Sequence, residues 1–346
     1  MIVLRIFLII VIVGTVPYTS RSDEPRDSAD TSVTLLTFGD VNLGRHVGKM
    51  LLKGDTLFPF QRIQTLLQSA DIVFCNLESQ LSDQHGETQH PKNNLIFTGP
   101  PQGGASLARG GVSVVSTSNN HAYDYGYRAL IETITNLDAS GIGHVGTTSD
   151  SNRLYRPLVK RISGITFAFF GVTALMNVPC CEWKPYIAWA DTGKLFPEIR
   201  GVRDFVDVTI VSYHGDTEYR DRPTQRQRDF FHALINEGVD VVLGHHSHVP
   251  QGVELYRGGW CVFSLGNFVF NQPQHEWTMK SVGMRWVFDR KNAKVRIASI
   301  DVIPIRTGFQ PSESVDERER RDILDRIHEL SNVRFPWSCD GTAPIQ

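Results

Sequence analysis

Side chains that commonly bind metal ions stand at the ends of several apolar runs in this sequence. Asp40 comes two residues after the run 33–38, and Asn120 comes two residues after the run 112–118. Carboxylate and amide oxygens and imidazole nitrogens are the ligands that divalent ions such as Mn, Fe or Zn take in proteins. The residues placed in this way are Asp40, Asn120, His214, His246 and His248. The pattern predicts a metal centre assembled at one edge of a sheet.

Each candidate ligand has a simpler interpretation when it is taken alone. Asp40 could belong to an ordinary turn, because turns favour Asp, and Glu78 could be a surface carboxylate. Residues 119–121 could form a capped turn before a helix that begins near Tyr127. Taken together the residues favour the metal site, in which Glu78 could bridge two metal ions and Asn120 could offer an amide oxygen.

The histidines divide into candidate site residues and ordinary polar residues. His246 and His248 are spaced i, i+2, so in an extended chain they project to the same side and can reach one metal ion or two neighbouring ions. His245 projects to the other side and is expected to be structural. His121 could protonate a leaving group, with Asp124 as the acceptor that orients its ring. The expected ordinary residues are His85, His90, His144, His232, His275 and His328.

The elements that must position these residues alternate between strands and helices. The Val-, Ile- and Phe-rich runs lack a clean period of two, as strands covered on both faces do. They are 33–38, 72–75, 112–116, 165–170, 206–212, 239–243 and 260–265. Amphipathic patterns predict helices over 59–69 and 223–238, and Ser314 with Glu317 forms a capping box before a last helix. The alternation predicts an α/β fold with a largely parallel core, in which ligands bind beyond the carboxyl ends of the strands.

The beginning of the chain differs in character from the rest. Residues 1–20 hold a single basic side chain before an apolar run that is too short for a comfortable membrane span. They predict a signal peptide, with an uncleaved N-terminal anchor as the alternative, and residues 21–32 predict a flexible tether. The protein is therefore expected to be exported, either periplasmic or otherwise extracytoplasmic, or membrane-anchored. One domain is expected over 33–332, followed by a tail over 333–346.

The cysteines number five, an odd count for an exported protein. Cys75 and Cys261 lie in apolar runs and are expected to be buried thiols. Cys339 could form a disulfide with Cys180 or Cys181, or these thiols could stay free. The sequence has no CxxC pair, which argues against a thiolate zinc site. The formal charge of −2 provides no general attraction to nucleic acid or anionic lipid.

Motifs with these residues occur in order at 38–45, 71–79, 116–126, 214–219, 244–252 and 263–270. In these motifs the chain resembles the bacterial capsule-synthesis CapA family, the poly-γ-glutamate capsule proteins, which is similar in fold to the calcineurin-like metallophosphoesterases. The resemblance runs from about Val33 to Asn332. It implies a four-layer α-β-β-α sandwich with two mixed sheets and a site for two metal ions. The ligands that it implies are Asp40, Glu78, Asn120, His214, His246 and His248.

The chain also departs from these families. Metallophosphoesterases carry a histidine two residues after the first Asp, where this chain has Asn42, and they usually bridge the metals with Asp, where it has Glu78. Both features fit the capsule family better than a generic phosphatase. Capsule proteins typically show His-Trp-Gly at the fourth motif, where this chain has His214, Gly215 and Asp216. Without the Trp, the substrate pocket is expected to lack one aromatic wall.

Two more residues complete the candidate site. Arg45 and Asn267 could contact an anion or oxyanion, and their alternative roles are a surface salt bridge and a turn cap. The full set favours an exported metal-dependent hydrolase, in which two metal ions activate water on a phosphoester or on a bond of an exopolymer. The alternative is a non-catalytic, membrane-tethered accessory protein that binds a nascent anionic polymer such as poly-γ-glutamate. The expected partners are the polymer or phosphoester and membrane-bound polymer synthase subunits, and not nucleic acid.

Overall fold

The computed structural model describes residues 32–179, 181–314 and 316–333. The predicted signal peptide or anchor and nearly all of the predicted tether lie outside these residues, as do Cys180, Cys339 and the disulfide considered for them. Cys75 and Cys261 are buried thiols, as predicted. Within the described ranges, no helix combines the length and the apolar character needed to cross a membrane.

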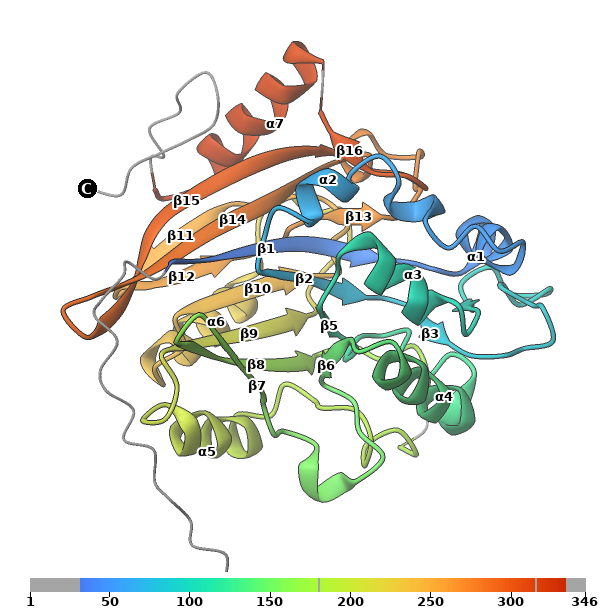
Figure 1. Cartoon of the computed structure of the whole chain (residues 1–346), viewed down its shortest axis with the longest axis horizontal. Helices are drawn as coiled ribbons and strands as arrows, with labels where there is room; N and C mark the ends of the chain where they lie inside the picture. The colour runs from blue at the N-terminus through green and yellow to red at the C-terminus, as the bar shows by residue number, and fades with distance from the viewer. Residues whose placement is uncertain (1–31, 180, 315, 334–346) are drawn as a thin grey trace, which may run out of the picture. The chain divides into compact units, whose positions relative to one another are not determined.

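The larger sheet has eight strands in the order β16-β15-β14-β1-β2-β5-β6, with β13 paired to β1 (Figure 1). Its parallel strands are β1 (Ser32–Val41), β2 (Ile72–Leu77), β5 (Val114–Ser116), β6 (Gly143–Val145) and β13 (Asn267–Val269). Its antiparallel strands are β14 (Lys280–Lys291), β15 (Lys294–Arg306) and β16 (Ser312–Glu313). The sheet is therefore mixed, as the resemblance implies.

The second sheet has six strands in the order β11-β12-β10-β9-β8-β7. Its parallel centre consists of β8 (Ile165–Thr173), β9 (Val208–His214), β10 (Val241–His245) and β12 (Gly259–Val262). Antiparallel strands β7 (Leu158–Ile162) and β11 (Val253–Tyr256) form its edges. A separate pair, β3 (Gln80–Leu81) and β4 (Thr98–Gly99), follows β2 along the chain.

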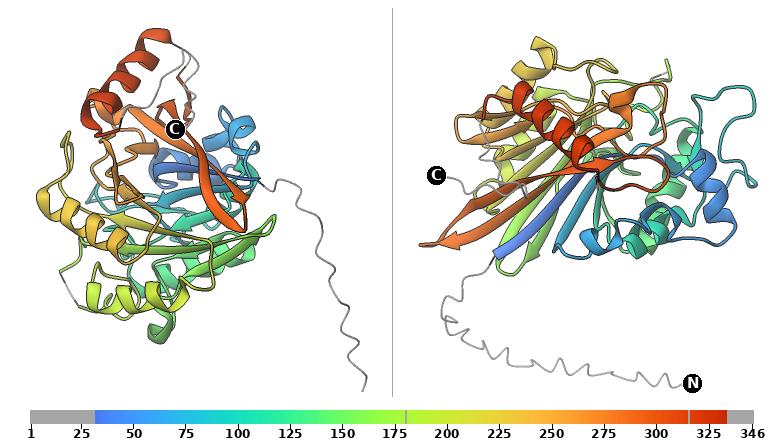
Figure 2. Two further views of the ribbon diagram at one scale, coloured as in Figure 1. Left: turned by 90° about the vertical axis from the view of Figure 1, so that its left-hand side faces the viewer. Right: turned by 90° about the horizontal axis from the view of Figure 1, so that it is seen from above.

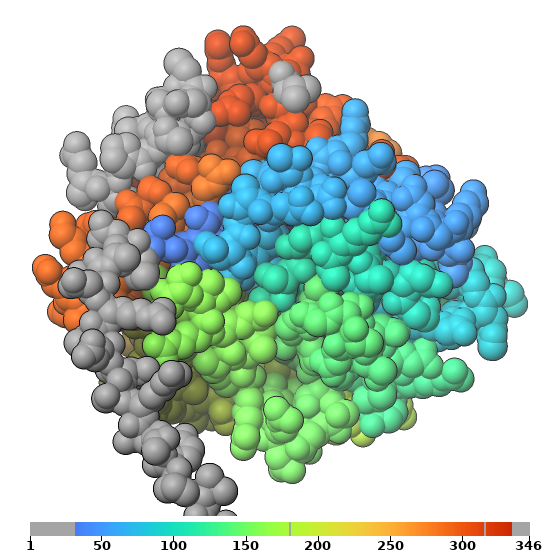
Figure 3. All heavy atoms as spheres, in the orientation of Figure 1, coloured from blue at the N-terminus to red at the C-terminus, as the bar shows by residue number. Residues whose placement is uncertain are grey.

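The two sheets pack face to face, with helices on their outer faces (Figure 2). Phe74 of β2 stacks on Phe169 of β8 across the interface, with ring centroids 5.8 Å apart. The helices α1 (Arg45–Leu52), α2 (Gln64–Leu67), α3 (Gly103–Gly110) and α4 (Gly126–Ala139) belong to the side of the larger sheet, and α5 (Thr192–Val202) and α6 (Gln225–Asn236) to that of the smaller. This is the predicted four-layer α-β-β-α sandwich. In the space-filling view, α2, α3 and their loops hide most of β1 and β2 (Figure 3).

Two helix predictions need correction. The pattern over 59–69 is not one helix but a 3₁₀ turn, η1 (Phe58–Phe60), followed by the short α2. The last helix, α7 (Glu317–Leu330), is capped by Asp316, whose side chain accepts a hydrogen bond from the backbone N–H of Glu319. The N-cap of this helix therefore lies two residues after the predicted Ser314. The remaining 3₁₀ turns are η2 (Ser151–Arg153) and η3 (Glu276–Thr278).

Three of the parallel strands begin with the same hydrogen-bonded pair of residues. Asp71, Asp207 and Asp240 precede β2, β9 and β10, and each carboxylate accepts the backbone N–H of a threonine on the neighbouring strand at 2.7–2.8 Å. The same threonine accepts the aspartate N–H through its carbonyl oxygen. These pairs terminate the sheets at their amino edge and leave no strand-end N–H unpaired at those positions.

Candidate metal centre

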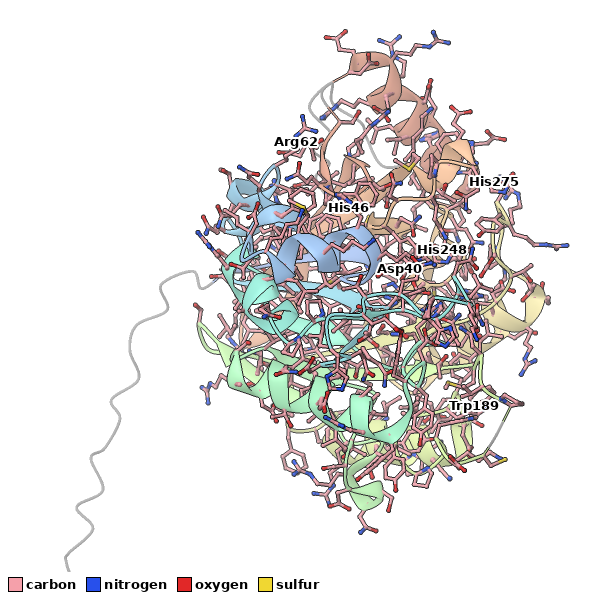
Figure 4. All side chains as sticks on the ribbon, turned by 90° about the vertical axis from the view of Figure 1, so that its right-hand side faces the viewer. Asp40, His46, Arg62, Trp189, His248 and His275 are labelled. Atoms are coloured by element: carbon pink, nitrogen blue, oxygen red, sulfur yellow. The ribbon has the colours of Figure 1, made fainter. Side chains whose placement is uncertain are left out.

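The predicted ligands converge because the strands that carry them end at the same edge of the sandwich. Asp40 in β1 lies opposite Asn76 in β2 and Asn267 in β13, and His214 ends β9 opposite His245 in β10. Seen from that edge, Asp40 and His248 lie close together in the middle of the molecule (Figure 4). Parallel strands with this register bring residues that are far apart in sequence to one place, as predicted.

His246 and His248 reach the site by a route that differs from the predicted extended chain. Both have left-handed backbone conformations, with φ of +87° and +59°. Their ring centroids are 6.0 Å apart, and the backbone N–H of His246 donates to Asp40 Oδ2 at 3.2 Å. A left-handed conformation is unfavourable for a residue with a Cβ, and two within three residues indicate a turn that the surrounding contacts hold in place.

The first group of candidate metal ligands lies around the Nε2 atom of His214. This atom lies 2.8 Å from Asn120 Oδ1 and 3.2 Å from His246 Nδ1. Glu78 Oε1 lies 3.6 Å from it. The ligand atoms of Glu78, His214 and His246 all lie within 4.8 Å of one another, which is the spacing of atoms that could share one ion.

A second group shares Glu78 with the first. It consists of Asp40, Glu78 and His248, again with ligand atoms within 4.8 Å of one another. His248 Nε2 is 4.0 Å from Glu78 Oε1, and its Nδ1 is 2.8 Å from Asn267 Oδ1. When Nδ1 carries the proton and donates to Asn267, the lone pair of Nε2 is directed toward Glu78. The shared carboxylate therefore lies where a residue bridging two ions would lie.

The surroundings of Glu78 fit a cation. Its side chain is fully buried, and neither carboxylate oxygen accepts a hydrogen bond from any described residue. Burial, followed by the negative charges of Asp40 and Glu218, raises the pKa of Glu78 well above its usual value. A buried carboxylate without donors is unfavourable unless a positive charge compensates it, and a divalent ion would supply that charge.

The pKa values of two of the histidine ligands also suit metal binding. Burial and the neighbouring His246 hold the pKa of His214 well below its usual value, and burial together with His248 lowers the pKa of His246 to about 3. Both rings are therefore neutral, the form that binds metals. Burial would raise the pKa of Asp40, but the nearby imidazole groups of His245 and His248 outweigh it and hold that pKa well below the usual range. Burial would lower the pKa of His248, but the neighbouring Asp40 outweighs it and raises that pKa.

His121 and Asp124 form the predicted pair beside these groups. His121 Nδ1 lies 2.8 Å from Asp124 Oδ2, and its Nε2 lies 3.9 Å from Glu78 Oε1. Phe97 contacts both partners, because its ring centroid is 4.2 Å from that of His121 and its backbone N–H donates to Asp124. The ring of His121 is thus held with one nitrogen on a carboxylate and the other facing the candidate ligands.

The structure also places Asn42, at which the chain departs from the metallophosphoesterases it resembles, and the two candidate anion contacts, Asn267 and Arg45. Asn42 Oδ1 accepts the backbone N–H of Gly44 at 2.8 Å. The amide of Asn267 is engaged on both sides, since its Oδ1 faces His248 and its Nδ2 donates to Gln272 Oε1 and to the carbonyl of Thr278. Arg45 lies beside Phe97, with its guanidinium carbon 4.4 Å from the ring centroid.

Several residues of the site were not among those predicted. Asn76 donates to Asp40 Oδ1 at 2.8 Å and lies 3.1 Å from His214 Nδ1, and Asn119 donates to Asn76 in turn. Asn177, from the loop after β8, accepts the side-chain N–H of Asn120 and so turns the Oδ1 of that amide toward His214. His245, expected to be structural, is fully buried with Nδ1 3.4 Å from Asp40 Oδ1.

Comparisons with known proteins relate the chain to capsule-synthesis proteins. A family model for the bacterial capsule synthesis protein PGA_cap matches residues 34–272. The "PGA biosynthesis protein CapA" of Bacillus subtilis (strain 168) is 27% identical over 343 residues, covering 96% of this chain and 87% of that protein. The "Probable polyglutamine synthesis accessory protein MT0602" of Mycobacterium tuberculosis is 25% identical over 331 residues, covering 89% and 86%. Among solved structures, the calcineurin-like phosphoesterase YfkN of Bacillus subtilis covers 87% of this chain and 98% of its own, with 13% identity and a TM-score of 0.44.

Proposed function

The chain belongs to the bacterial capsule synthesis protein PGA_cap family, and we propose that it is an exported, metal-dependent hydrolase-like protein. Its role would be the synthesis or processing of a poly-γ-glutamate-type exopolymer. The observation that carries the proposal is Glu78, a fully buried carboxylate that accepts no hydrogen bond from the described residues and belongs to two groups of candidate ligands. A structural carboxylate would have donors around it, whereas this one is surrounded by other metal-binding side chains.

We assign two divalent ions, of Mn, Fe or Zn type, to the predicted ligands: Asp40, Glu78, Asn120, His214, His246 and His248. When bound, such ions lower the pKa of a water molecule and stabilise negative charge that develops in the transition state. Asn267 orients His248 because its Oδ1 accepts a hydrogen bond from the Nδ1–H of that ring. We therefore give Asn267 a positioning role, because its amide has no group left for a substrate oxygen.

His121 is proposed to donate a proton to the leaving group. Asp124 holds Nδ1, so the proton that can be transferred sits on Nε2, the atom that faces Glu78 at 3.9 Å. The aromatic ring of Phe97 fixes the plane of the imidazole. A positioned acid of this kind contributes about a hundredfold or more to the rate. The bond it acts on is a phosphoester or an amide or ester bond of the polymer.

A non-catalytic accessory role is the second candidate. It is favoured by Asn42, which stands where metallophosphoesterases carry a histidine and whose amide oxygen already accepts the N–H of Gly44. Asn42 therefore adds no ligand to the first ion. The name of the Mycobacterium tuberculosis relative also describes an accessory protein. In this role the centre would bind an anionic polymer, together with membrane-bound polymer synthase subunits, without cleaving it.

We also propose that the protein works outside the cytoplasm. The apolar run in residues 1–20 supports export, through a cleaved signal peptide or an uncleaved anchor. A fusion of residues 1–32 to a reporter that is active only after export should be active. A reporter that stays wholly in the cytoplasm would contradict this part of the proposal and leave the metal centre unaffected.

Elemental analysis of the purified protein, combined with an activity screen, tests the hydrolase. We expect one or two divalent ions per chain after reconstitution, and metal-dependent release of product from model phosphodiesters or from γ-glutamyl oligomers. A protein that takes up no metal would refute both roles of the centre. A protein that binds metal and polymer but cleaves neither substrate class, in cells that need it for polymer production, would establish the accessory role instead.

A further inference from the structure

Arg45 is a partly buried cation without an acidic partner. It is the first residue of α1, and no described carboxylate forms an ion pair with its guanidinium. Its Nη2 donates to the carbonyl of Asn94 at 2.7 Å, whereas its Nε is buried without a hydrogen bond. Burial lowers the pKa of Arg45, and the charges of Glu78 and Asp124 oppose that effect. Buried guanidinium groups are normally paired, so this one has hydrogen-bonding capacity left for an anion.

The local structure holds the guanidinium in place. Arg45 has a left-handed backbone conformation, with φ of +52°, and its backbone N–H donates to the carbonyl of Thr88. The guanidinium carbon lies 4.4 Å from the ring centroid of Phe97 and 5.9 Å from that of Phe270. Unfavourable backbone conformations cluster at functional sites, where the surrounding structure holds a side chain in a fixed direction. The conformation of Arg45 is consistent with such a role.

The same two rings connect Arg45 to the metal centre. Phe97 contacts His121 at 4.2 Å between ring centroids, and Phe270 contacts His248 at 5.0 Å. One aromatic ring therefore separates the guanidinium from each of these two histidines, whose Nε2 atoms lie 3.9 and 4.0 Å from Glu78 Oε1. A small pocket of about 20 Å³ borders Arg45 on another side, where Asn42, Asn271 and Phe309 contribute to its wall.

We propose that Arg45, Phe97 and Phe270 form a subsite for an oxyanion, a carboxylate or a phosphate, that the substrate carries near the bond held at the metal centre. This subsite rests on the proposed function, and it narrows the substrate class to molecules with a negative charge close to the reacting bond. A guanidinium binds a planar carboxylate or a phosphate through two parallel hydrogen bonds. Repeating carboxylates of a poly-γ-glutamate chain and the phosphate of a phosphoester both offer this chemistry.

Calorimetric titration of anions into the metal-loaded protein tests the subsite. The probes are inorganic phosphate in one arm and γ-glutamylglutamate in the other, and the variants are Arg45→Gln and Arg45→Lys. The control is Arg62→Gln, an equal charge change at an exposed arginine that lies well apart from Asp40 and His248 (Figure 4). Since a bound metal ion also attracts anions, the informative quantity is the affinity of each variant relative to the unaltered protein.

We expect Arg45→Gln to weaken binding of one probe by about tenfold or more, on the scale of hydrogen bonds to a charged group. The affinity of Arg45→Lys for that probe should lie between those of Arg45→Gln and the unaltered protein, because lysine keeps the positive charge but cannot donate two parallel hydrogen bonds. The Arg62→Gln control should bind both probes as tightly as the unaltered protein does. The probe with the larger loss identifies the substrate anion. Equal affinities in Arg45→Gln and the unaltered protein, or no binding of either probe to the unaltered protein, would overturn the subsite.

Two further measurements separate a lost anion subsite from a structural role of Arg45 and from failure of the proposed metal centre. Thermal unfolding of each variant shows whether Arg45 only fastens the loop through Asn94, in which case the melting temperature falls and the anion affinities stay equal. Arg45→Lys replaces Arg45→Gln if the latter does not fold. Metal content measured on the same samples tests the proposed function by itself, and the titration is repeated without metal if none binds, since the guanidinium belongs to the chain.

Discussion

The two edges of the sandwich carry similar acidic side chains in opposite surroundings. At the amino edge, Asp71, Asp207 and Asp240 each accept one backbone N–H from a neighbouring strand. At the carboxyl edge, Glu78 is more deeply buried than any of these and accepts no hydrogen bond from the described residues. The three aspartates complete the backbone hydrogen bonding of the sheets. The fold leaves the carboxylate of Glu78 without such partners.

This difference teaches how to separate structural carboxylates from functional ones. Residue type and position at a strand end do not separate them, because both edges place an acid next to an apolar run. The partners do: a backbone N–H satisfies a structural aspartate, and imidazole rings surround a candidate ligand. Substitutions that remove charge should therefore lower metal binding at the carboxyl edge and leave it unchanged at the amino edge.

The largest expected effect comes from Glu78→Gln. The substitution removes the shared carboxylate, so metal content should fall and hydrolysis should drop by more than about a hundredfold, the scale of a lost electrostatic group in an active site. Metal-free Glu78→Gln should melt at the same temperature as the metal-free parent or higher at pH 8. Metal analysis, activity and thermal unfolding measure the three quantities.

The sign of the stability change follows from the pKa of Glu78. Because the folded pKa is raised, the folded metal-free protein loses stability as the pH rises above the unfolded value, and Gln avoids that loss. Saturating metal should reverse the order, since an ion at about a hundred times its Kd adds about 2.7 kcal/mol to the parent alone. A metal-free variant that melts well below the metal-free parent would mean that Glu78 is structural.

His121→Ala should separate chemistry from metal binding at the same edge. The proposed proton donor is no ligand, so metal content and folding should be kept while turnover falls by about a hundredfold. Asp124→Asn should cause a smaller loss, because the ring stays and only its orientation is weakened. His246→Ala is the matched comparison, and it should lose metal together with activity. Full polymer production in cells with His121→Ala would favour the accessory role.

Seven parallel strands, β1, β2, β5, β8, β9, β10 and β12, could be predicted from sequence because they are largely buried and read as continuous apolar runs. The long strands β14 and β15 were not predicted, because they are only partly buried and charged residues interrupt their apolar positions. The structure over 59–69 could not be predicted, because tertiary packing decides it. Phe60 is buried against Gly110 of α3, where even a Cβ would lie 2.5 Å from its ring. The packing of Phe60 requires the 3₁₀ turn η1, and this turn interrupts the apolar pattern over 59–69, which by itself has helical spacing.

The candidate site shows the same limit in its supporting residues. Asn76 could have been found, since alternation along β2 places it on the inward face with Ile72 and Phe74. Asn177 could not, because it stands 57 residues from Asn120 in an irregular loop and only the folded chain brings the two amides together. The left-handed turn of His246 and His248 was also hidden, since Gly and Asn, the residues that favour it, are absent there.

Asn177→Ala tests whether such a supporting contact matters. Its carboxamide accepts the N–H of Asn120 at 3.1 Å, and loss of that acceptor frees the Asn120 amide to rotate away from His214. We expect metal affinity or activity to fall by about tenfold, the lower end for a residue that orients a ligand. Asn177→Asp restores the acceptor and should recover most of the loss. Equal loss in both variants would show that the loop itself, and not the hydrogen bond, is required.

The smallest expected effect lies at the amino edge, in Asp240→Asn. Burial raises the pKa of Asp240 to about 6 although it accepts the N–H of Thr209. The folded protein therefore loses stability as the pH rises from about 4 to 6, and Asn, which keeps the acceptor oxygen, removes that loss. We expect about 1–2 kcal/mol of added stability at pH 8 and none at pH 4, allowing for partial solvent screening of a shift worth about 1.4 kcal/mol per unit. Thermal unfolding at both pH values measures this change, and metal content and activity should stay at the parent level.

Asp207→Asn is the control for this prediction. Asp207 also pairs with Arg290 at 2.8 Å, so removal of its charge should give no added stability. A loss of metal in Asp240→Asn would show that the two edges are coupled and that the contrast between them does not hold.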